Sequence, residues 1–415
     1  MTPWYALLLE LLNDFRYNVL LEFINKSLER FWIMIYFDNS ATTKPNTQVL
    51  EAYQKVALQY FGNASSIHHL GMEAEKLFMQ ARKQIATLLN VKSSEIIFTS
   101  GGTEGNNFAI KGIAKQFSSR GRHIITSSIE HPSVYETCEQ LKNEGFEITY
   151  LPVDHEGRIS LHDLKNAMRN DTILVSIMHT NNEVGTIQPI KEIGEIVNQF
   201  PKAFFHVDYV QGAGKIPLNF YESHIDLATI SGHKFHGLKG TGALYIREGT
   251  KIQPLLAGGG QEFGLRSGTE NVAGMVAMAK ALRLSIENFT KSKENLMHIK
   301  KYLFEQLKMI QGVRINTPVE GSAPHIINFS VEGYKAEVLV HAIAKHEIYV
   351  STTSACSSKL GEPSKTLVAM GLPANCTSSS IRISLSYENT MEEAKQAIQV
   401  IKQCIEQLKF AMRGS

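Results

Sequence analysis

The chain has 415 residues, 43% hydrophobic and 20% charged, which is ordinary for a folded protein of one to three domains. Its 42 basic and 40 acidic residues leave a formal net charge of +2, so no direct nucleic-acid surface is expected. Four cysteines without a C-x-x-C pair form no disulfide framework, which favours the cytoplasm, and no apolar run is long enough to predict a membrane span.

Residues 1–33 form an apolar, helix-like N-terminal extension that several charged residues interrupt. This stretch lacks the basic start and the small-residue cleavage site of a signal peptide. We expect a helix appended ahead of Met34. A helix that docks on a partner or on a membrane surface is the alternative.

From Met34 onward, strand-like and helix-like segments alternate. Helical periodicity fills most of the intervals between the short β-rich runs, for example over residues 109–117 and 134–143. This alternation predicts an α/β fold with a mainly parallel sheet and helices on both of its faces. The predicted strands are Glu95–Thr99, His123–Thr126, Phe146–Leu151, Thr172–Met178, Ala203–Val207, Asp226–Ile230 and Gly242–Ile246.

The pattern changes at about Val272, where a long helix is predicted over Ala273–Ile310. It indicates a second, smaller C-terminal α/β domain, with the boundary inside the long helix near residue 290. We therefore expect a large domain over residues 45–289 and a small domain made of residues 34–44 and 290–415. The later predicted elements are strands at Ile326–Ser330, Ile348–Ser351 and Ile381–Ser386, a helix over Ala336–Lys345 and a final helix from Met391.

Two segments at the ends of predicted strands favour a cofactor site. Lys234, in Ser231-Gly232-His233-Lys234, follows an apolar strand, where desolvation would make its amine nucleophilic and able to form an imine. Asp208 ends another strand and could pair with a pyridinium nitrogen, with Val210 on the same strand face. Taken alone, a surface lysine and a turn-capping aspartate explain these residues equally well.

Other polar residues fit the same site. The turn at Gly102 and Thr103 opens a helix and suits a phosphate, although it matches neither nucleotide-binding glycine motif. His131 follows a strand and could transfer protons, and Asn182 follows another. Arg382 lies within an apolar strand, where a substrate carboxylate would match its guanidinium. Each residue alone also fits a structural polar role.

The cysteines divide into two kinds. Cys356 lies among small polar residues in 353–358, which predicts a loop with an accessible thiol, or else an unreactive one. Cys138 and Cys404 lie on apolar helical stripes and are expected in the core, whereas Cys376 lies in a polar connection. No histidine pair has the companions of a zinc site, so no metal is expected.

Taken together, these segments resemble the cysteine desulfurases of the NifS/IscS type, over residues 34–415. The resemblance depends on many motifs in the right order rather than on any single one. They are Tyr36–Thr43, Gly62–Ser66, Thr103, His131, Asn182, Asp208–Gln211, Ser231–Lys234, Arg266–Asn271, Ser354–Cys356 and Ser380–Arg382. Tyr209, where relatives commonly have alanine, and Ala64, where many have proline, depart from the family pattern.

The resemblance implies a homodimeric enzyme of the pyridoxal 5'-phosphate (PLP) dependent transferase fold type I. Lys234 would be the Schiff-base lysine, and Cys356 would become the persulfide. His131 would stack on the ring and transfer protons, and Asp208 would hold the ring nitrogen. Asn182 and Gln211 would contact the ring hydroxyl side, and Arg382 would hold the substrate carboxylate, with Asn182 also binding substrate. The phosphate would be bound by Gly102, Thr103, Ser231 and His233, and Thr269 would reach the phosphate of the partner subunit.

The implied reaction converts L-cysteine to L-alanine and transfers sulfur to Cys356, then to an acceptor protein. Acceptors of relatives include iron–sulfur scaffold proteins and tRNA thiolation enzymes. The loop around Cys356 resembles the longer-loop branch, which presents its persulfide directly to acceptors. Two alternatives stay open: a selenocysteine or cysteine-sulfinate lyase on the same PLP core, and a scaffold protein that regulates a sulfur relay.

Overall fold

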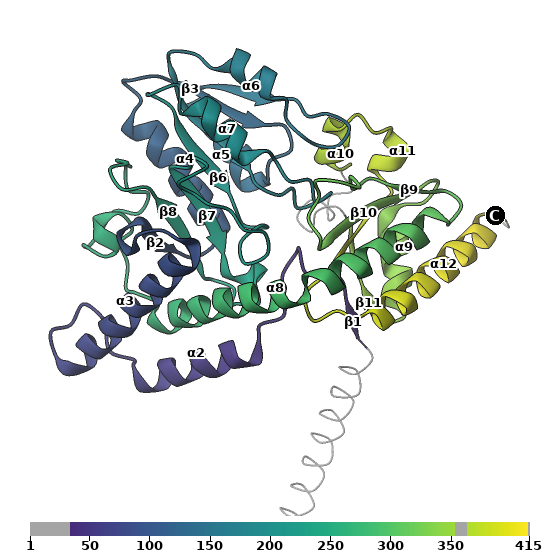
Figure 1. Cartoon of the computed structure of the whole chain (residues 1–415), viewed down its shortest axis with the longest axis horizontal. Coiled ribbons are helices and arrows are strands. Elements are labelled where there is room, and N and C mark those ends of the chain that lie inside the picture. The colour runs from purple at the N-terminus through teal and green to yellow at the C-terminus, as the bar shows by residue number, and fades with distance from the viewer. Residues whose placement is uncertain (1–33, 353–362, 414–415) are drawn as a thin grey trace, which may run out of the picture.

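The computed structural model describes residues 34–352 and 363–413 (Figure 1). The predicted N-terminal helix over residues 1–33 and the predicted loop thiol of Cys356 therefore lie outside the described residues. In the described part, no helix is long and apolar enough to cross a membrane.

A seven-stranded sheet forms the centre of the larger part of the molecule (Figure 1). Five neighbouring strands are parallel, and one strand, β8, runs antiparallel to both of its neighbours. The predicted mainly parallel sheet is therefore confirmed. Its strands, in spatial order, are β2 (Ile96–Thr99), β8 (Gly242–Ile246), β7 (Leu227–Ser231), β6 (Phe204–Asp208), β5 (Thr172–Met178), β3 (His123–Ser127) and β4 (Glu147–Leu151).

Helices cover both faces of this sheet because its strands are apolar on both sides. Ile124 and Ile125, adjacent on β3, belong to two different cores, and Leu174 and Val175 on β5 repeat the pattern. One core packs against α4 and α5, and the other against α3 and α8. The helices of this part are α2 (Thr47–Gln59), α3 (His69–Leu89), α4 (Gly102–Gln116), α5 (Pro132–Asn143), α6 (Leu161–Ala167), α7 (Ile190–Val197) and α8 (Val272–Lys308), with short 3-10 turns η1 (Ser93–Glu95), η2 (Gly232–Lys234) and η3 (Glu262–Gly264).

The smaller part contains a four-stranded antiparallel sheet and a separate two-stranded parallel ribbon. The single strand predicted over Ile348–Ser351 is wrong: its first half pairs with β1 and its second half with β13, so the chain changes sheets at Val350. The strands are β1 (Ile35–Tyr36), β9 (Val313–Ile315), β10 (Ile326–Val331), β11 (Ile348–Tyr349), β12 (Ser351–Thr352) and β13 (Ser380–Ser384), and the helices are α9 (Ala336–Ala344), α10 (Lys365–Ala369), α11 (Ala374–Thr377) and α12 (Met391–Arg413).

The long helix α8 joins the two parts. Leu284 packs in the core of the large sheet, whereas Phe289 packs in the core beneath α9 and α12. Ile35 also belongs to that second core, which brings the start of the described chain to the smaller part. The domain division near residue 290 stays a prediction, and this change of core along α8 supports it.

The cysteines of the described residues are all buried. Cys138 and Cys404 pack in cores, as their helical stripes predicted. The assignment of Cys376 to a polar connection is incomplete, because α11 turns this side chain inward and buries it fully.

Candidate active site

Several parallel strands end at one edge of the large sheet and place polar residues there. The strands β2, β5, β6 and β7 end at Thr99, Met178, Asp208 and Ser231. The segments predicted to bind a cofactor follow these ends along the chain. In open α/β sheets this edge is where ligands bind, because loops and helix N-termini converge there.

Lys234 lies in the turn η2, directly after β7. The turn requires glycine at position 232, because a Cβ there would lie 2.2 Å from Oγ1 of Thr241. Among its contacts, the Lys234 Nζ donates hydrogen bonds to the carbonyl oxygens of Ser40 and Ala41, at 2.5 and 2.9 Å. Backbone oxygens therefore hold the amine at the edge of the sheet.

The N-terminus of α4 forms an anion cradle beside this lysine. Its N-cap, Gly101, has no side chain to accept the N–H groups of the first turn, which leaves them available to an anion. A Cβ on Gly102 would lie 3.0 Å from Val210 and 3.7 Å from Cβ of Ser231, so Ser231 faces the glycine turn. The Ser231 hydroxyl is buried and has no hydrogen-bond partner among the described residues. A phosphate fits this donor set.

Asp208 is held at the end of β6 by two donors. Its Oδ1 accepts the backbone N–H of Val210 at 3.0 Å, and its Oδ2 accepts the amide of Asn106 at 2.8 Å. The same Asn106 nitrogen donates to the Ser133 hydroxyl at 2.9 Å. Asn106 and Ser133 were not identified from the sequence. Their one signal is position: Asn106 lies one turn into the helix that the glycines open, and Ser133 lies two residues after His131.

His131 caps α5 and joins the same network. Its Nδ1 accepts the backbone N–H of Ser133 at 3.1 Å, so the proton of the neutral ring lies on Nε2. Burial lowers the pKa of His131; the charge of Asp208 opposes this shift and that of Lys234 reinforces it. The imidazole is therefore neutral near pH 7, within electrostatic range of both residues, and can donate or accept a proton through Nε2.

Arg382 lies on β13, and its side chain is only 2% exposed. Its Nη1 donates to the carbonyl oxygen of Asn182 at 2.8 Å, and its Nη2 donates to Oδ1 of Asp38 at 2.9 Å. Asp38 thus already supplies a carboxylate to this arginine, a contact that the sequence does not predict. A substrate carboxylate would share or replace that contact.

The segment Asp38–Thr43 covers the site, a position that the chemistry of its residues does not predict. Its carbonyl oxygens accept Lys234 and also the Gln211 amide, which reaches the Ser40 oxygen at 3.0 Å. Its Thr43 hydroxyl donates to the carbonyl oxygen of His233 at 2.9 Å. Burial lowers the pKa of His233 to about 4, so its ring is neutral near pH 7. The sequence signal of this segment is its place among the motifs of the family resemblance, as Tyr36–Thr43.

Two buried titratable groups lie close to the site. Burial raises the pKa of Glu130 to about 8, although Ser127 and the Met178 backbone donate to it at 2.6 and 3.0 Å. Burial also lowers the pKa of Lys215 to about 7, and the charges of Lys234 and Arg382 act in the same direction. At neutral pH, therefore, neither the Glu130 carboxyl nor the Lys215 amine carries its usual full charge.

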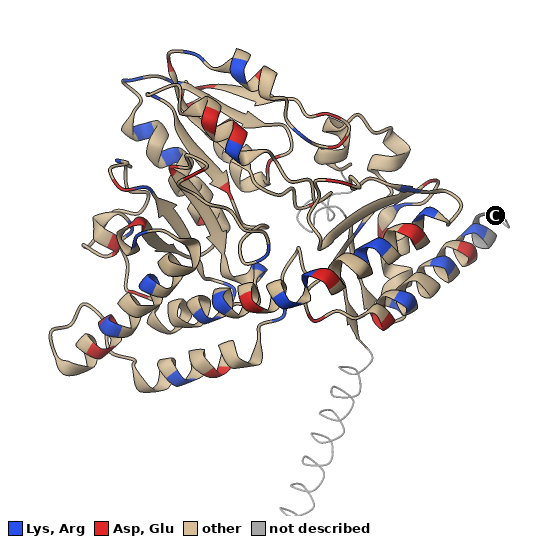
Figure 2. Cartoon of the chain, viewed as in Figure 1, with Lys and Arg blue, Asp and Glu red and all other residues tan. Residues whose placement is uncertain are grey.

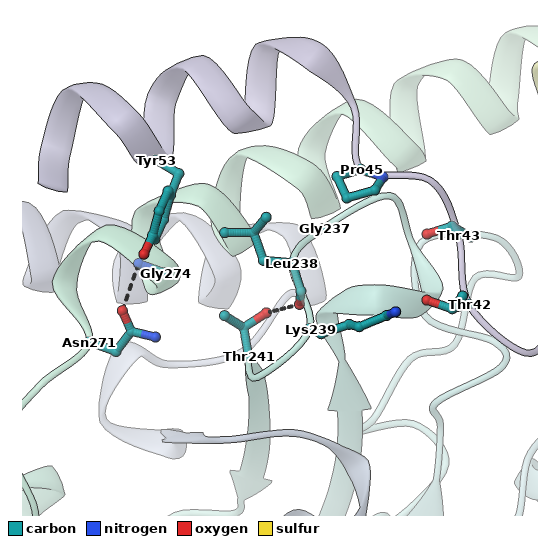
Figure 3. A pocket seen from close by; sticks show the side chains of 10 residues that line it. All are labelled: Thr42, Thr43, Pro45, Tyr53, Gly237, Leu238, Lys239, Thr241, Asn271 and Gly274. Atoms are coloured by element: carbon teal, nitrogen blue, oxygen red, sulfur yellow. Dashed lines mark hydrogen bonds between the residues drawn. The ribbon is translucent and has the colours of Figure 1, made fainter. Parts of the chain in front are cut away.

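A cavity of about 420 Å³ lies next to the site, between α2, the start of α8 and the loop after η2 (Figure 3). It includes Thr42 and Thr43, which contact His233, but none of the predicted site residues. Its lining is Thr42, Thr43, Pro45, Tyr53, Gly237, Leu238, Lys239, Thr241, Asn271 and Gly274.

Most of the predicted site residues thus lie at one edge of the large sheet. Thr269 is an exception: it is exposed, and no hydrogen bond within the described residues joins it to this group. Cys356 lies outside the described residues. Over residues 34–352 and 363–413, no cluster of three or more His, Cys, Asp or Glu side chains could hold a metal ion.

The model of the class-V aminotransferase family matches residues 35–396. The chain belongs to this family. Among curated relatives, a NifS/IcsS protein homolog of Lactobacillus delbrueckii subsp. bulgaricus is 50% identical over 367 residues, 88% of this chain and 95% of the relative. The cysteine desulfurase IscS of Dictyoglomus turgidum is 47% identical over 376 residues, 90% of this chain and 95% of the relative.

Among solved structures, a NifS-like protein superposes with a TM-score of 0.85 at 40% identity, over 90% of this chain and 99% of that one. These likenesses confirm the predicted fold class and the resemblance to cysteine desulfurases. As a class-V aminotransferase of the cysteine desulfurase type, the chain is a PLP-dependent enzyme that acts on L-cysteine.

Proposed function

We propose that Lys234 is the amine that binds PLP and, once substrate has displaced it, the base that removes the substrate Cα proton. The convergence of Lys234, Asp208 and the α4 cradle at one sheet edge carries this proposal. A lysine held by two carbonyl oxygens is already oriented toward that edge. Proton transfer needs such positioning as well as basicity.

PLP, when bound, supplies an aldehyde for the amine and an electron-withdrawing ring. Asp208 would pair with the ring nitrogen, and its own two donors keep the carboxylate oriented. The unpartnered Ser231 hydroxyl would bind the phosphate, together with Gly102, Thr103 and His233. Asn182 and Gln211 would contact the ring hydroxyl side; the buried Gln211 Oε1 has no hydrogen-bond partner among the described residues, which supports this role.

Arg382 would bind the substrate carboxylate, and Cys356 would take its sulfur. In this step the Cys356 thiolate attacks the substrate sulfur, the Cβ–S bond breaks, and its electron pair stays with the substrate carbon. The Cβ carbon then takes a proton, the Cα carbon regains the one it lost, and alanine is released while Cys356 keeps a persulfide. The neutral His131 ring, with its proton on Nε2, is suited to deliver or accept protons during these steps.

Alanine release from L-cysteine tests the roles of the two reactive residues. We expect Lys234→Ala and Cys356→Ala each to lower the rate at least a hundredfold. The cysteines of the described residues are all buried, so none of them is placed to replace Cys356. Cys404→Ala, which alters a buried core thiol, is the control and should keep the wild-type rate. Undiminished release by Cys356→Ala would favour a selenocysteine or cysteine-sulfinate lyase instead.

We also propose a homodimer, in which Thr269 reaches the partner subunit's phosphate site. The support is an unusually exposed apolar surface on α2, α3 and their connection, where Ile67 is 95% and Phe61 is 72% exposed. Charged side chains are sparse along α2 (Figure 2). The surface also includes Leu50, Tyr53, Leu58, Leu70, Met72 and Met79.

Sedimentation of Phe61→Glu tests this surface. A buried charge in a dimer interface is costly, so the variant should become monomeric, whereas Met309→Glu, on another exposed position, should stay dimeric. A monomeric wild-type protein would refute the dimer.

We further propose that the acceptor is a cytoplasmic iron–sulfur scaffold protein or a tRNA thiolation enzyme, the two classes that the resemblance to the NifS/IscS type implies. Loading Cys356 with labelled sulfur and presenting both kinds of protein would separate these two possibilities. Transfer to neither would contradict the proposed acceptor classes.

A further inference from the structure

Residues 258–271, which we call the arm, form the later part of the connection between β8 and α8 and include Thr269. Arg82 on α3 binds it through a buried bidentate ion pair: Nη1 and Nη2 donate to the two carboxylate oxygens of Glu262, at 2.8 and 2.6 Å. Glu262 also accepts the backbone N–H of Phe98 on β2 at 2.7 Å. This geometry fixes the orientation of Glu262 as well as its distance from the sheet.

Three aromatic rings surround the Arg82 guanidinium. Its Cζ lies 5.1 Å from the ring centre of Phe78, 4.7 Å from that of Phe98 and 5.1 Å from that of Phe263. Phe263 belongs to the arm, and it covers the guanidinium although 57% of the residue is exposed. The arginine thus contacts the arm through both a carboxylate and an aromatic face, a combination that lysine could not reproduce.

The backbone of the arm is held in an unfavourable conformation at this point. Glu262 and Phe263 have φ values of 48° and 59°, in the left-handed region that side chains other than glycine rarely adopt. Such conformations persist where the surroundings enforce them, and they cluster at functional sites. The Arg82 pair and the Phe98 N–H are described contacts that hold Glu262 at this point.

The second half of the arm has two further anchors. Arg266 donates to both carboxylate oxygens of Glu104 on α4, at 2.8 and 3.2 Å, and Glu270 accepts the Ser65 hydroxyl at 3.2 Å. Between these anchors Thr269 is exposed. The Ser65 contact brings the arm to the connection between α2 and α3, where the exposed apolar surface lies.

We propose that Arg82 and Glu262 are positioning residues for the active site of the partner subunit: they hold the arm so that Thr269 reaches the partner's cofactor phosphate. This inference rests on the proposed homodimer and PLP site. The pair would act across the interface although both residues belong to one chain.

Mixed dimers test the direction of this effect. The loosened arm is Arg82→Met with Glu262→Met, because apolar replacement of a whole buried ion pair often preserves folding. In the first dimer, a chain with the loosened arm and an intact Lys234 pairs with a Lys234→Ala chain. In the second, a wild-type chain pairs with a chain carrying all three substitutions. Each dimer thus contains one site able to bind PLP through Lys234.

The readout is the rate at which PLP leaves that one site after dilution, followed by its visible absorbance. We expect wild-type retention in the first dimer and at least tenfold faster loss in the second, whose lysine-bearing site faces the loosened arm. A purely structural role within the same chain would reverse the two results, and equal rates would also overturn the proposal. Wild-type homodimers that bind no PLP would instead refute the proposed function itself.

Two further variants keep the test decisive. Glu262→Gln retains an acceptor for the Phe98 N–H and should give the same ordering of the two dimers with a smaller difference, even if the double substitution impairs folding. The control is Arg283→Met with Glu287→Met, which removes an exposed ion pair of 2.8 Å on α8. It should leave PLP retention unchanged in both dimers, whereas the same loss from the control would refute a specific role of the arm.

Discussion

Replacement of Lys215 by methionine should stabilise the protein, by an amount that depends on pH. The Lys215 Nζ is buried, although part of its stem is accessible, and it has no hydrogen-bond partner among the described residues. Burial, with added repulsion from Lys234 and Arg382, lowers its pKa from 10.5 to about 7. Methionine has a similar length and no charge to desolvate.

The size of the effect follows from proton linkage. The unfolded lysine keeps its proton up to about pH 10.5, whereas the folded one loses it near pH 7, so between these values the unfolded state binds more protons and stability rises with pH. At pH 7 the penalty is about 4 kcal/mol, taking ~1.36 kcal/mol per pKa unit. It falls by about 2 kcal/mol between pH 7 and pH 9.

Urea unfolding of Lys215→Met and wild type at pH 7, 8 and 9, at one fixed PLP concentration, measures this difference. The advantage of the variant should shrink steadily as the pH rises. Lys191→Met, on an exposed position of α7, is the control and should show no such trend. An advantage that is constant with pH, or a variant less stable than wild type at pH 7, would show that burial of the Lys215 amine carries no such penalty.

Three other variants have distinct expected outcomes. Folded Glu130 keeps its proton to about pH 8, whereas unfolded Glu130 keeps it only to about pH 4.5, so the stability of the wild type falls as the pH rises between these values. The fall is about 1.4 kcal/mol per pH unit. Glu130→Gln should remove it, which thermal unfolding at pH 5 and pH 8 measures. Asn106→Leu removes a donor to Asp208 and should weaken PLP binding about tenfold in a titration, whereas unchanged affinity would exclude this role. Tyr209→Phe loses the hydrogen bond to the Ile216 carbonyl and should cost about 1 kcal/mol of unfolding free energy without changing alanine release.

The large sheet could be predicted from the sequence because its strands are buried on both faces. The predicted ends of Thr172–Met178 and Gly242–Ile246 match the structure, and the other strands differ by a residue or so at their ends. The strand predicted over 348–351 was wrong because a continuous β-rich run does not reveal that its halves pair with different partners. Pairing is a tertiary property that local pattern does not contain.

The site residues also divide into those that the sequence could locate and those that it could not. Asp208 and Lys234 could be located because they directly follow apolar strands, and parallel strands end at a common edge. Asn106 could not, since its role depends on how α4 packs over β6. The backbone oxygens of Ser40 and Ala41 that hold Lys234 carry no side-chain signal, and the Asp38 contact of Arg382 joins residues far apart in the chain.

Lys215 is a buried amine whose pKa burial lowers to about 7, so it is the natural competitor of Lys234 for the PLP aldehyde. Borohydride reduction of the PLP-loaded protein fixes the cofactor to the amine that holds it, and peptide mass spectrometry then locates the modified lysine. We expect one modified peptide, containing Lys234, and no change at Lys215. Modification of Lys215, or of no lysine at all, would contradict this expectation.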